Sequence, residues 1–220
     1  YLYEAAARTS QRQNLADIRK GEYEGLPDKL RDPAWKPDFG DAVFNPKSGA
    51  TVTGARKFLI GYNVILNTPD SKMAQEIALR IRESGRQKKD ASGATVKDEK
   101  GQPFEIPGTL KAAKAMGVFL ERFKIAQVSI NLVDFDITPP HAAFEEVRRQ
   151  ARTLGIDATG SEIVGLTPLA AILTAGRFYA DQTGMKTHDE QSLIELAVTK
   201  LGLSQLEPFE PRKKIIEYQL

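Results

Sequence analysis

The chain has 220 residues, 41% of them hydrophobic and 27% charged, with a formal net charge of +2 at pH 7. These values are ordinary for a globular protein, and so small a charge gives no support for nucleic-acid binding. The absence of cysteine excludes disulfides, thiol nucleophiles and cysteine-ligated zinc. No apolar run approaches the roughly 18 residues that a membrane-spanning helix needs. We therefore expect a cytoplasmic protein with no nucleic-acid or membrane partner.

The first part of the chain contains short elements separated by glycine and proline. They are a strand at 1–3, a short helix at 14–20 and a helical turn at 22–30. The chain begins without methionine, in what reads as the middle of a strand, so we expect a fragment of a longer protein. We divide it into 1–54, the end of one α/β subdomain plus a ligand-binding loop, and 55–220, a second subdomain.

Residues 38–54 form a loop that leads into a strand predicted for residues 55–68. Three glycines and few large side chains occupy the loop, so its backbone can approach a ligand closely or adopt positive φ. The strand is rich in β-branched and aromatic residues, which indicates that it is covered on both faces. With Arg56 and Lys57 at the junction, the arrangement suits a flat, anionic ligand. A glycine-rich connection without a binding role is the alternative.

From residue 55 to about residue 179, the predicted order is strand, helix, strand, strand, helix, strand, helix. This order contains β-α-β-β-α-β, the split βαβ pattern of a ferredoxin-like sandwich, an α/β (α+β) fold with an antiparallel or mixed sheet and helices on one face. The predicted strands are 55–68, 114–122, 125–135 and 156–166, and helices begin near residues 69, 138, 168 and 189. We expect Met73, Ile77 and Ile81 to be buried and Thr138 to cap its helix.

Residues 86–108 are polar, charged and rich in glycine, and we expect a flexible insertion there. Basic side chains gather around the end of the preceding helix: Arg80, Arg82, Arg86, Lys88 and Lys89. They either complement the helix dipole in solvent or form a basic rim for an acidic ligand. We find no internal repeat and no Walker, dinucleotide-binding or HExxH metal motif.

Few side chains in the chain are suited to acid–base chemistry or to polar ligand contacts. His141 follows two prolines at a predicted helix start, where the helix N-terminus lowers its pKa, and it is either a ligand contact or a packing residue. Glu162 lies in an otherwise apolar strand and needs a partner, which is either a cation of the protein or a ligand. Gln127, Ser129 and Asn131 form one polar face of a strand, which fits either a half-exposed strand or a row of ligand-binding groups.

Several segments resemble the glutamate formiminotransferase (formimidoyltransferase) family, the folate-dependent enzymes of histidine degradation. The longest is NPKSGATVTGARKFLIGYNVILNT, and others are YLYEAAA, LADIRKGEYEGLPDKL, IRESGR, QVSINLVDF, GSEIVGLTPLAA and PFEPRKKIIEYQL. They keep the family's order over nearly the whole chain. Together they are specific, although no single segment is.

The resemblance implies a glutamate formimidoyltransferase, which transfers the formimino group from N-formimino-L-glutamate to N5 of tetrahydrofolate. Tetrahydrofolate is then the co-substrate, N-formimino-glutamate the second small-molecule ligand, no metal takes part, and a homodimer is the expected assembly. The resemblance also implies that this chain is the carboxyl-terminal part of the transferase domain and that the amino-terminal subdomain is missing.

The folate-binding segment of the family matches residues 40–49. The residues carried over are Gly40, Asp41, Ala42, Val43, Phe44, Asn45, Pro46, Lys47, Ser48 and Gly49. We expect backbone groups to bind the pterin amide edge, Phe44 its ring, and Lys47 a carboxylate, while Asp41 stands where the family often has proline. Candidates for further contacts are Arg56, Gln127, His141 and Glu162.

No catalytic residue can be named in this chain by resemblance. The family's catalytic histidine belongs to an upstream histidine–proline pair, and no such pair occurs here. We therefore expect the fragment alone to bind folate weakly and to be inactive or nearly so. A non-catalytic folate-binding or regulatory module is the alternative. RNA binding is disfavoured, because polar side chains occupy the strand face on which an RNA-binding sheet places aromatic residues.

Overall fold

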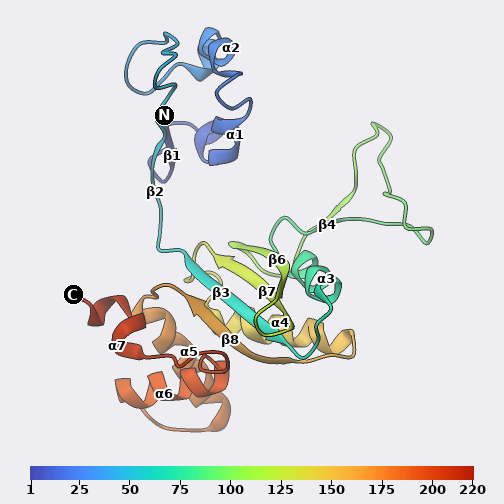
Figure 1. Ribbon diagram of the computed structural model, residues 1–220, viewed down its shortest axis with the longest axis vertical. Coiled ribbons are helices and arrows are strands. Elements are labelled where there is room, and N and C mark those ends of the chain that lie inside the picture. Colours follow the sequence, from blue (N-terminus) through green and yellow to red (C-terminus); the bar gives the residue numbers. More distant parts are fainter. The chain divides into compact units, whose positions relative to one another are not determined.

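Residues 1–57 form the first of two units in the computed structural model, which describes residues 1–220 (Figure 1). A parallel pair of strands, β1 (Leu2–Glu4) and β2 (Thr53–Ala55), joins the two ends of this unit. The short helices between them are η1 (Ser10–Arg12), α1 (Leu15–Arg19), α2 (Leu26–Arg31) and η2 (Pro33–Trp35). Because residues 53–55 pair with β1, the strand predicted for 55–68 begins only at Ile60.

A buried ion pair holds the first unit together. The Arg12 Nη1 and Asp38 Oδ2 atoms are 2.7 Å apart, and their side chains are only 7% and 3% exposed. Asp38 also accepts a hydrogen bond from the Leu2 N–H at 2.8 Å, and Arg12 donates to the Lys36 carbonyl at 2.6 Å. Burial alone would raise the pKa of Asp38, but the Leu2 N–H and the Arg12 guanidinium together hold it below its usual range.

Residues 58–220 form the second unit around a four-stranded antiparallel sheet. Its strands are β3 (Ile60–Leu66), β6 (Ala113–Leu120), β7 (Ile125–Leu132) and β8 (Ala158–Val164), in the order β6-β7-β3-β8. Helices α3 (Ser71–Ile81) and α4 (Pro140–Thr153) contact each other and pack on one face of this sheet (Figure 1). The expected mixed α/β class with helices on an antiparallel sheet is thus observed.

The core lies between the sheet and these helices. Tyr62 and Val64 of β3 pair with Ile130 and Val128 of β7, and all four side chains are buried. Their alternation along both strands brings apolar groups to the helix face. The Tyr62 hydroxyl donates to Ser161 Oγ at 2.8 Å, so its polar end is satisfied inside the core.

Three further helices follow the sheet. They are α5 (Leu169–Thr183), α6 (Glu190–Leu201) and the short α7 (Pro211–Lys214), with the final turn η3 (Ile216–Tyr218). The tail returns to the body of the unit, because Ile215 forms a parallel bridge with Thr167. No helix of the chain is both long and apolar enough to cross a bilayer.

Two expectations about the helices are wrong in detail. Thr138 does not cap α4, whose N-cap is Pro139 without a side-chain hydrogen bond, because the Thr138 hydroxyl donates instead to the Lys111 carbonyl at 2.6 Å. Met73 is only partly buried, and Ala74 joins Ile77 and Ile81 in the buried stripe of α3. In both cases the packing partner, rather than the local pattern, sets the side chain's role.

Gly117 marks the closest approach of α3 to the edge strand β6. A Cβ at this position would lie 2.2 Å from the Gln75 backbone nitrogen, and the Gln75 side chain accepts the Gly117 N–H at 2.8 Å. Because backbone atoms cannot move aside cheaply, we expect Gly117→Ala to destabilise the second unit by about 1–3 kcal/mol, as overpacking does. Urea denaturation would measure the loss. Met116→Ala, which changes an exposed neighbour, is the control, and equal stability of the two variants would contradict the prediction.

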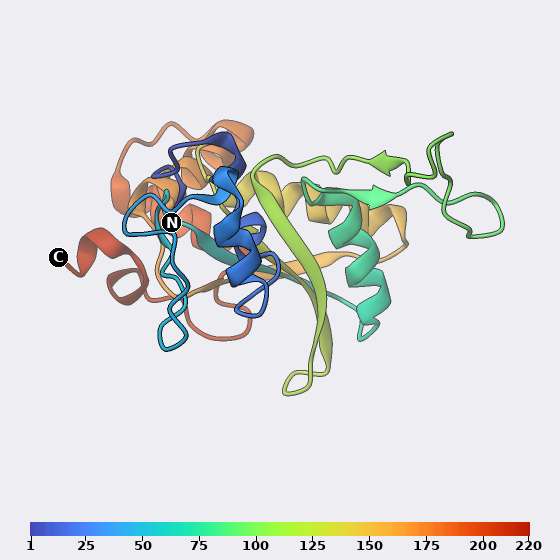
Figure 2. The ribbon, with the colours of Figure 1, turned by 90° about the horizontal axis from the view of Figure 1, so that it is seen from above.

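Residues 86–108 form an arm that extends from the second unit (Figure 2). Its base is the pair β4 (Arg86–Gln87) and β5 (Glu105–Ile106), and beyond it three backbone hydrogen bonds join Lys88, Val96 and Phe104 in a ring. Two turns with the same internal hydrogen bonds follow, at 90–94 and 98–102. Each is encoded by Lys-Asp-x-x-Gly, a short repeat that the sequence reading missed. The flexibility of the arm stays a prediction.

Candidate functional site

The loop at 40–49 has a shape that its own hydrogen bonds define. Asn45 Oδ1 accepts hydrogen bonds from the N–H groups of Lys47 at 2.9 Å and Ser48 at 3.2 Å. The Gly49 N–H donates to the Asn45 carbonyl at 2.8 Å. Gly49 has a φ of 61°, in the left-handed region that glycine adopts without steric cost. This half of the loop is therefore a closed turn.

Phe44 anchors that turn to the rest of the first unit. Its ring packs against the ring of Tyr23 with the centroids 5.4 Å apart. The Tyr23 hydroxyl donates to the Pro46 carbonyl at 2.7 Å, which ties the loop down a second time. The expectation that Phe44 covers a pterin ring is untested. The structure places the side chain in a contact within the protein.

A pocket of about 350 Å³ borders the other half of the loop. Phe39 and Val43 line it with side chains that are 69% and 75% exposed, which is unusual for apolar residues. Asp41 lines the same pocket. The Arg8 guanidinium lies over the Phe39 ring, 4.8 Å from its centroid. The pocket thus combines an apolar wall with a carboxylate, and its volume is within the usual range for small-molecule sites.

The second candidate surface is the sheet face opposite α3 and α4. One row on this face runs across all four strands, through the register pairs Met116–Ser129, Ser129–Asn63 and Asn63–Glu162. The adjacent row, which contains Gly61 and Asn131, is open to solvent at Asn131. The row on the other side of Asn63 and Ser129 contains Ile65 and Gln127. This row is covered, since Gln127 is 4% exposed. The expected polar face therefore exists, but it ranges from buried at Gln127 to exposed at Asn131.

Two hydrogen-bond acceptors on this side of the sheet have weak donors or none. Glu162 is half-buried and receives one long hydrogen bond, from Asn63 Nδ2 at 3.5 Å, and no lysine or arginine of its own unit pairs with it. The Oε1 atom of Gln127 is buried without any hydrogen-bond partner. Buried or half-buried acceptors without donors are costly, which makes the half-buried Glu162 a candidate to accept N–H groups from a ligand. Glu162 was expected to contact either a cation of the protein or a ligand. No cation of residues 58–220 pairs with it.

His141 lies on α4, which packs on the face of the sheet opposite the open face of its own unit. Its ring stacks on Phe178 of α5, with centroids 4.4 Å apart, so it sits between α4 and α5. Burial lowers the pKa of His141, although the nearby Glu145 carboxylate opposes the shift. The lowered pKa was expected, but its cause is burial in the helix layer rather than the helix N-terminus. Gln127 and Glu162, the other predicted site residues of this unit, lie in the strands β7 and β8.

Arg56 is the last of the residues predicted to contact a ligand. Arg56 is exposed at the end of the first unit and makes no hydrogen bond or ion pair there. No group of three or more His, Asp or Glu side chains converges in a way that could hold a metal ion.

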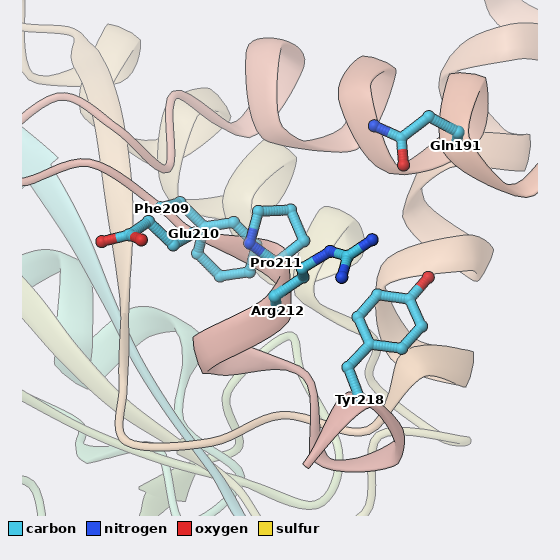
Figure 3. A pocket seen from close by; sticks show the side chains of 6 residues that line it. All are labelled: Gln191, Phe209, Glu210, Pro211, Arg212 and Tyr218. Carbon is cyan, nitrogen blue, oxygen red and sulfur yellow. The ribbon is translucent and has the colours of Figure 1, made fainter.

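A groove of about 720 Å³ near the carboxyl-terminal tail has few unpaired polar groups. Figure 3 shows its side chains, with Arg212 projecting between Pro211 and Tyr218. The Tyr218 hydroxyl donates to Glu190 at 2.6 Å, and the Gln191 amide donates to Glu195 at 2.7 Å. We assign this groove no role in the candidate site.

Two family models match the chain. Residues 61–220 match the formiminotransferase domain, and residues 1–56 match the N-terminal subdomain of the formiminotransferase domain. Among curated proteins, a formimidoyltransferase-cyclodeaminase of Mus musculus is 47% identical over 219 residues, and one of Dictyostelium discoideum is 45% identical over 221 residues. A glutamate formimidoyltransferase of Streptococcus pyogenes serotype M1 is 37% identical over 190 residues, which are 86% of this chain and 56% of that protein.

The matches correct one expectation, and they show what share of the relatives' length this chain covers. Because residues 1–56 match the N-terminal subdomain, the prediction that this subdomain is missing from the chain is wrong. The alignments cover 99% of this chain but 37% of the Mus musculus protein, and 100% of this chain but 38% of the Dictyostelium protein. The chain thus spans less than two fifths of the length of these relatives.

Proposed function

The chain belongs to the formiminotransferase domain family, and from this premise we propose that it binds and positions the two substrates of glutamate formimidoyltransferase. The reaction transfers the formimino group of N-formimino-L-glutamate to N5 of tetrahydrofolate in histidine degradation. The observation that carries the proposal is the pocket that borders the loop at 40–49, where an exposed apolar wall meets a carboxylate.

The residues at this pocket fit a reduced folate. A pterin presents a 2-amino group and a ring N–H side by side, and a carboxylate can accept both hydrogen bonds at once. We assign this role to Asp41 and the apolar contact with the pterin ring to Phe39 and Val43. When bound there, tetrahydrofolate supplies the N5 atom that accepts the formimino group. Phe44 supports the loop through Tyr23, and Lys47 remains the candidate for a substrate carboxylate.

The open sheet face of the second unit fits the formimino group of the other substrate. That group is an amidine, which is a cation with several N–H donors near neutral pH. Glu162 offers a half-buried carboxylate without a cationic partner in its unit. We propose that Glu162, oriented by Asn63, binds the amidinium, because charge-assisted hydrogen bonds are the strong ones.

The chain provides positioning rather than a base under this proposal. Proton transfer from N5 needs a group within hydrogen-bond reach of the substrate. His141 lies between α4 and α5, and His188 lies in an exposed turn before α6. Neither histidine lies on the open face of the sheet in its own unit, so we assign the general base to neither.

Replacing Glu162 tests the amidinium assignment. We expect Glu162→Gln to weaken the binding of N-formimino-L-glutamate about 10- to 100-fold, because a hydrogen bond to a charged group contributes about 1.5–3 kcal/mol. Calorimetric titration of the purified chain measures this, with Glu99→Gln, an exposed arm residue, as the control.

The same titrations separate the proposed transferase from a folate-binding module. A transferase must bind both substrates, whereas a folate-binding or regulatory module binds folate alone. Wild-type chain that binds 5-formyl-tetrahydrofolate but not N-formimino-L-glutamate would refute the positioning role. Binding of neither would refute the proposed function of these residues altogether.

The architecture of the second unit supports a finer assignment. We assign it to the ferredoxin-like split βαβ class, because β7 lies between β3 and β6 and β8 lies beside β3. A homodimer and a cytoplasmic location stay predictions.

A further inference from the structure

A groove of about 830 Å³ lies where the arm leaves the second unit. The end of α3 and the residues after it form one wall, and the arm strands β4 and β5 form the other. Figures 1 and 2 both show the arm starting beside the end of α3. The groove is separate from the folate pocket, which belongs to the first unit.

Two glycines fix the walls of this groove. A Cβ at Gly85 would lie 1.8 Å from the Ile106 carbonyl oxygen, and one at Gly108 would lie 1.9 Å from the Arg82 carbonyl oxygen. The two segments at which the arm begins and ends, near Gly85 and Gly108, are therefore in backbone contact with each other and with the end of α3. The Thr109 N–H also donates to the Arg80 carbonyl at 3.0 Å. These backbone contacts give the base of the arm one defined conformation.

Two arginines in the groove have no counter-charge. Arg82 is half-buried, and its Nε–H donates to the Gly85 carbonyl at 2.8 Å, which orients the guanidinium. Arg86, on β4, is also half-buried and makes no side-chain hydrogen bond. Neither arginine has a carboxylate within 4.0 Å, whereas Arg80, two residues before Arg82, is paired with Glu76 at 2.8 Å. Half-buried charges are ordinarily paired, so a partner is missing here.

We propose that this groove binds a phosphate-type oxyanion, either free or as a phosphate ester. Two planar guanidinium groups offer paired N–H donors, which match the oxygens of a phosphate and hold it in a defined orientation. Lys89 lines the groove as well, although its Nζ already contacts Thr95 Oγ1 at 2.6 Å. Of the basic side chains around the end of α3, we therefore assign Arg82 and Arg86 to a basic rim for an acidic ligand. Arg80 is instead paired with Glu76.

One unpaired carboxylate in the groove opposes this assignment and makes it testable, while Glu76, which also lines the groove, is paired with Arg80. Glu105 lies on β5, directly across the ladder from Gln87, and forms no ion pair. Its negative charge repels an anion, so removing the charge should strengthen the binding of phosphate. A site for a cation would show the opposite response. The sign of the effect at Glu105 thus distinguishes the two kinds of site.

Calorimetric titration of the whole chain with inorganic pyrophosphate at low ionic strength tests the proposal. We expect Arg86→Gln to weaken binding at least about tenfold. Glu105→Gln should strengthen it several-fold by removing a like charge. Lys100→Gln, in the second turn of the arm, is the matched control and should leave the affinity unchanged. Because the Arg86 guanidinium forms no hydrogen bond or ion pair, its replacement should not disturb the fold.

Three results with pyrophosphate would overturn the proposal, and a fourth comes from a comparison with citrate. They are the absence of pyrophosphate binding to the wild-type chain, unchanged binding by Arg86→Gln, and weaker binding by Glu105→Gln. Citrate, a carboxylate anion of similar charge, distinguishes the oxyanion class, and binding of citrate as tight as that of pyrophosphate would refute the phosphate assignment. Glycerol phosphate binding as well as orthophosphate would identify an ester as an acceptable ligand. The outcome does not depend on folate binding, so each proposal can fail alone.

Discussion

The Asp38→Asn variant is expected to lose about 3–5 kcal/mol of the stability of residues 1–57, because it leaves the buried Arg12 guanidinium without its counter-charge. A unit of this size has little stability in reserve, so we expect it to unfold while residues 58–220 stay folded. Hydrogen exchange measures this directly. Protection should disappear at the Thr53 N–H, which bonds the Tyr1 carbonyl, and persist in β3.

Two further variants make the test specific. Asp28→Asn removes a carboxylate that is 83% exposed and paired with Arg31, so it should change stability by less than about 1 kcal/mol. The double replacement of Arg12 by methionine and Asp38 by leucine removes both charges together and should restore much of the lost stability. Unchanged exchange in Asp38→Asn would show that the ion pair does not hold the unit together.

The same ion pair predicts an acid transition of the first unit. The pKa of Asp38 in the folded chain is held below its unfolded value of 3.8. The carboxylate therefore stabilises the fold at pH values above about 4, and this stability is lost as the pH falls through the folded pKa. Residues 1–57 should lose protection on acidification below about pH 4. The Asp38→Asn variant should lack this part of the pH dependence.

The Asp41→Asn variant is expected to bind 5-formyl-tetrahydrofolate about 10- to 100-fold more weakly than the wild-type chain. The physical reason is the loss of a charge-assisted pair, which contributes about 1.5–3 kcal/mol when one partner is ionised. Because Asp41 is exposed, the fold should be unaffected. Val43→Ser should weaken binding less, by removing apolar contact alone. Calorimetric titration at constant salt measures both effects.

Phe44→Ala is the informative comparison for the folate pocket. Phe44 packs on Tyr23, so we expect its removal to loosen the loop and lower the stability of the first unit. A variant that keeps full stability and still loses folate binding would assign the pterin contact to Phe44 and would contradict our assignment to Phe39 and Val43. Full affinity in Asp41→Asn would contradict the carboxylate assignment.

Local signals in the sequence predicted most of the helices and strands. A helix was predicted to begin near residue 189, and Asp189 caps α6 by accepting the Ser192 N–H at 2.8 Å. The continuous apolar run in β3 correctly indicated a strand covered on both faces. The family resemblance located the loop at 40–49 by short motifs. These features depend on neighbouring residues, so a single sequence carries them.

The candidate site depended on contacts between distant segments. The row Met116, Ser129, Asn63 and Glu162 comes from four strands, and it exists because β7 inserts between β6 and β3. Nothing in the local pattern of GSEIVG indicates that Glu162 lies beside Asn63. Likewise, only packing shows that Phe44 is engaged with Tyr23 and that Phe39 and Val43 are exposed.

The sequence by itself therefore determined the family, the element types and the loop. The tertiary structure alone decided which polar groups have partners. Whether Asp38, Glu162, Arg82 and Arg86 are paired is set by strand order, register and backbone approach, which are non-local. The electrostatic cost of an unpaired group depends on that surrounding structure. For this reason the buried ion pair of Asp38, the half-buried Glu162 and the groove with Arg82 and Arg86 could be identified only from the tertiary structure.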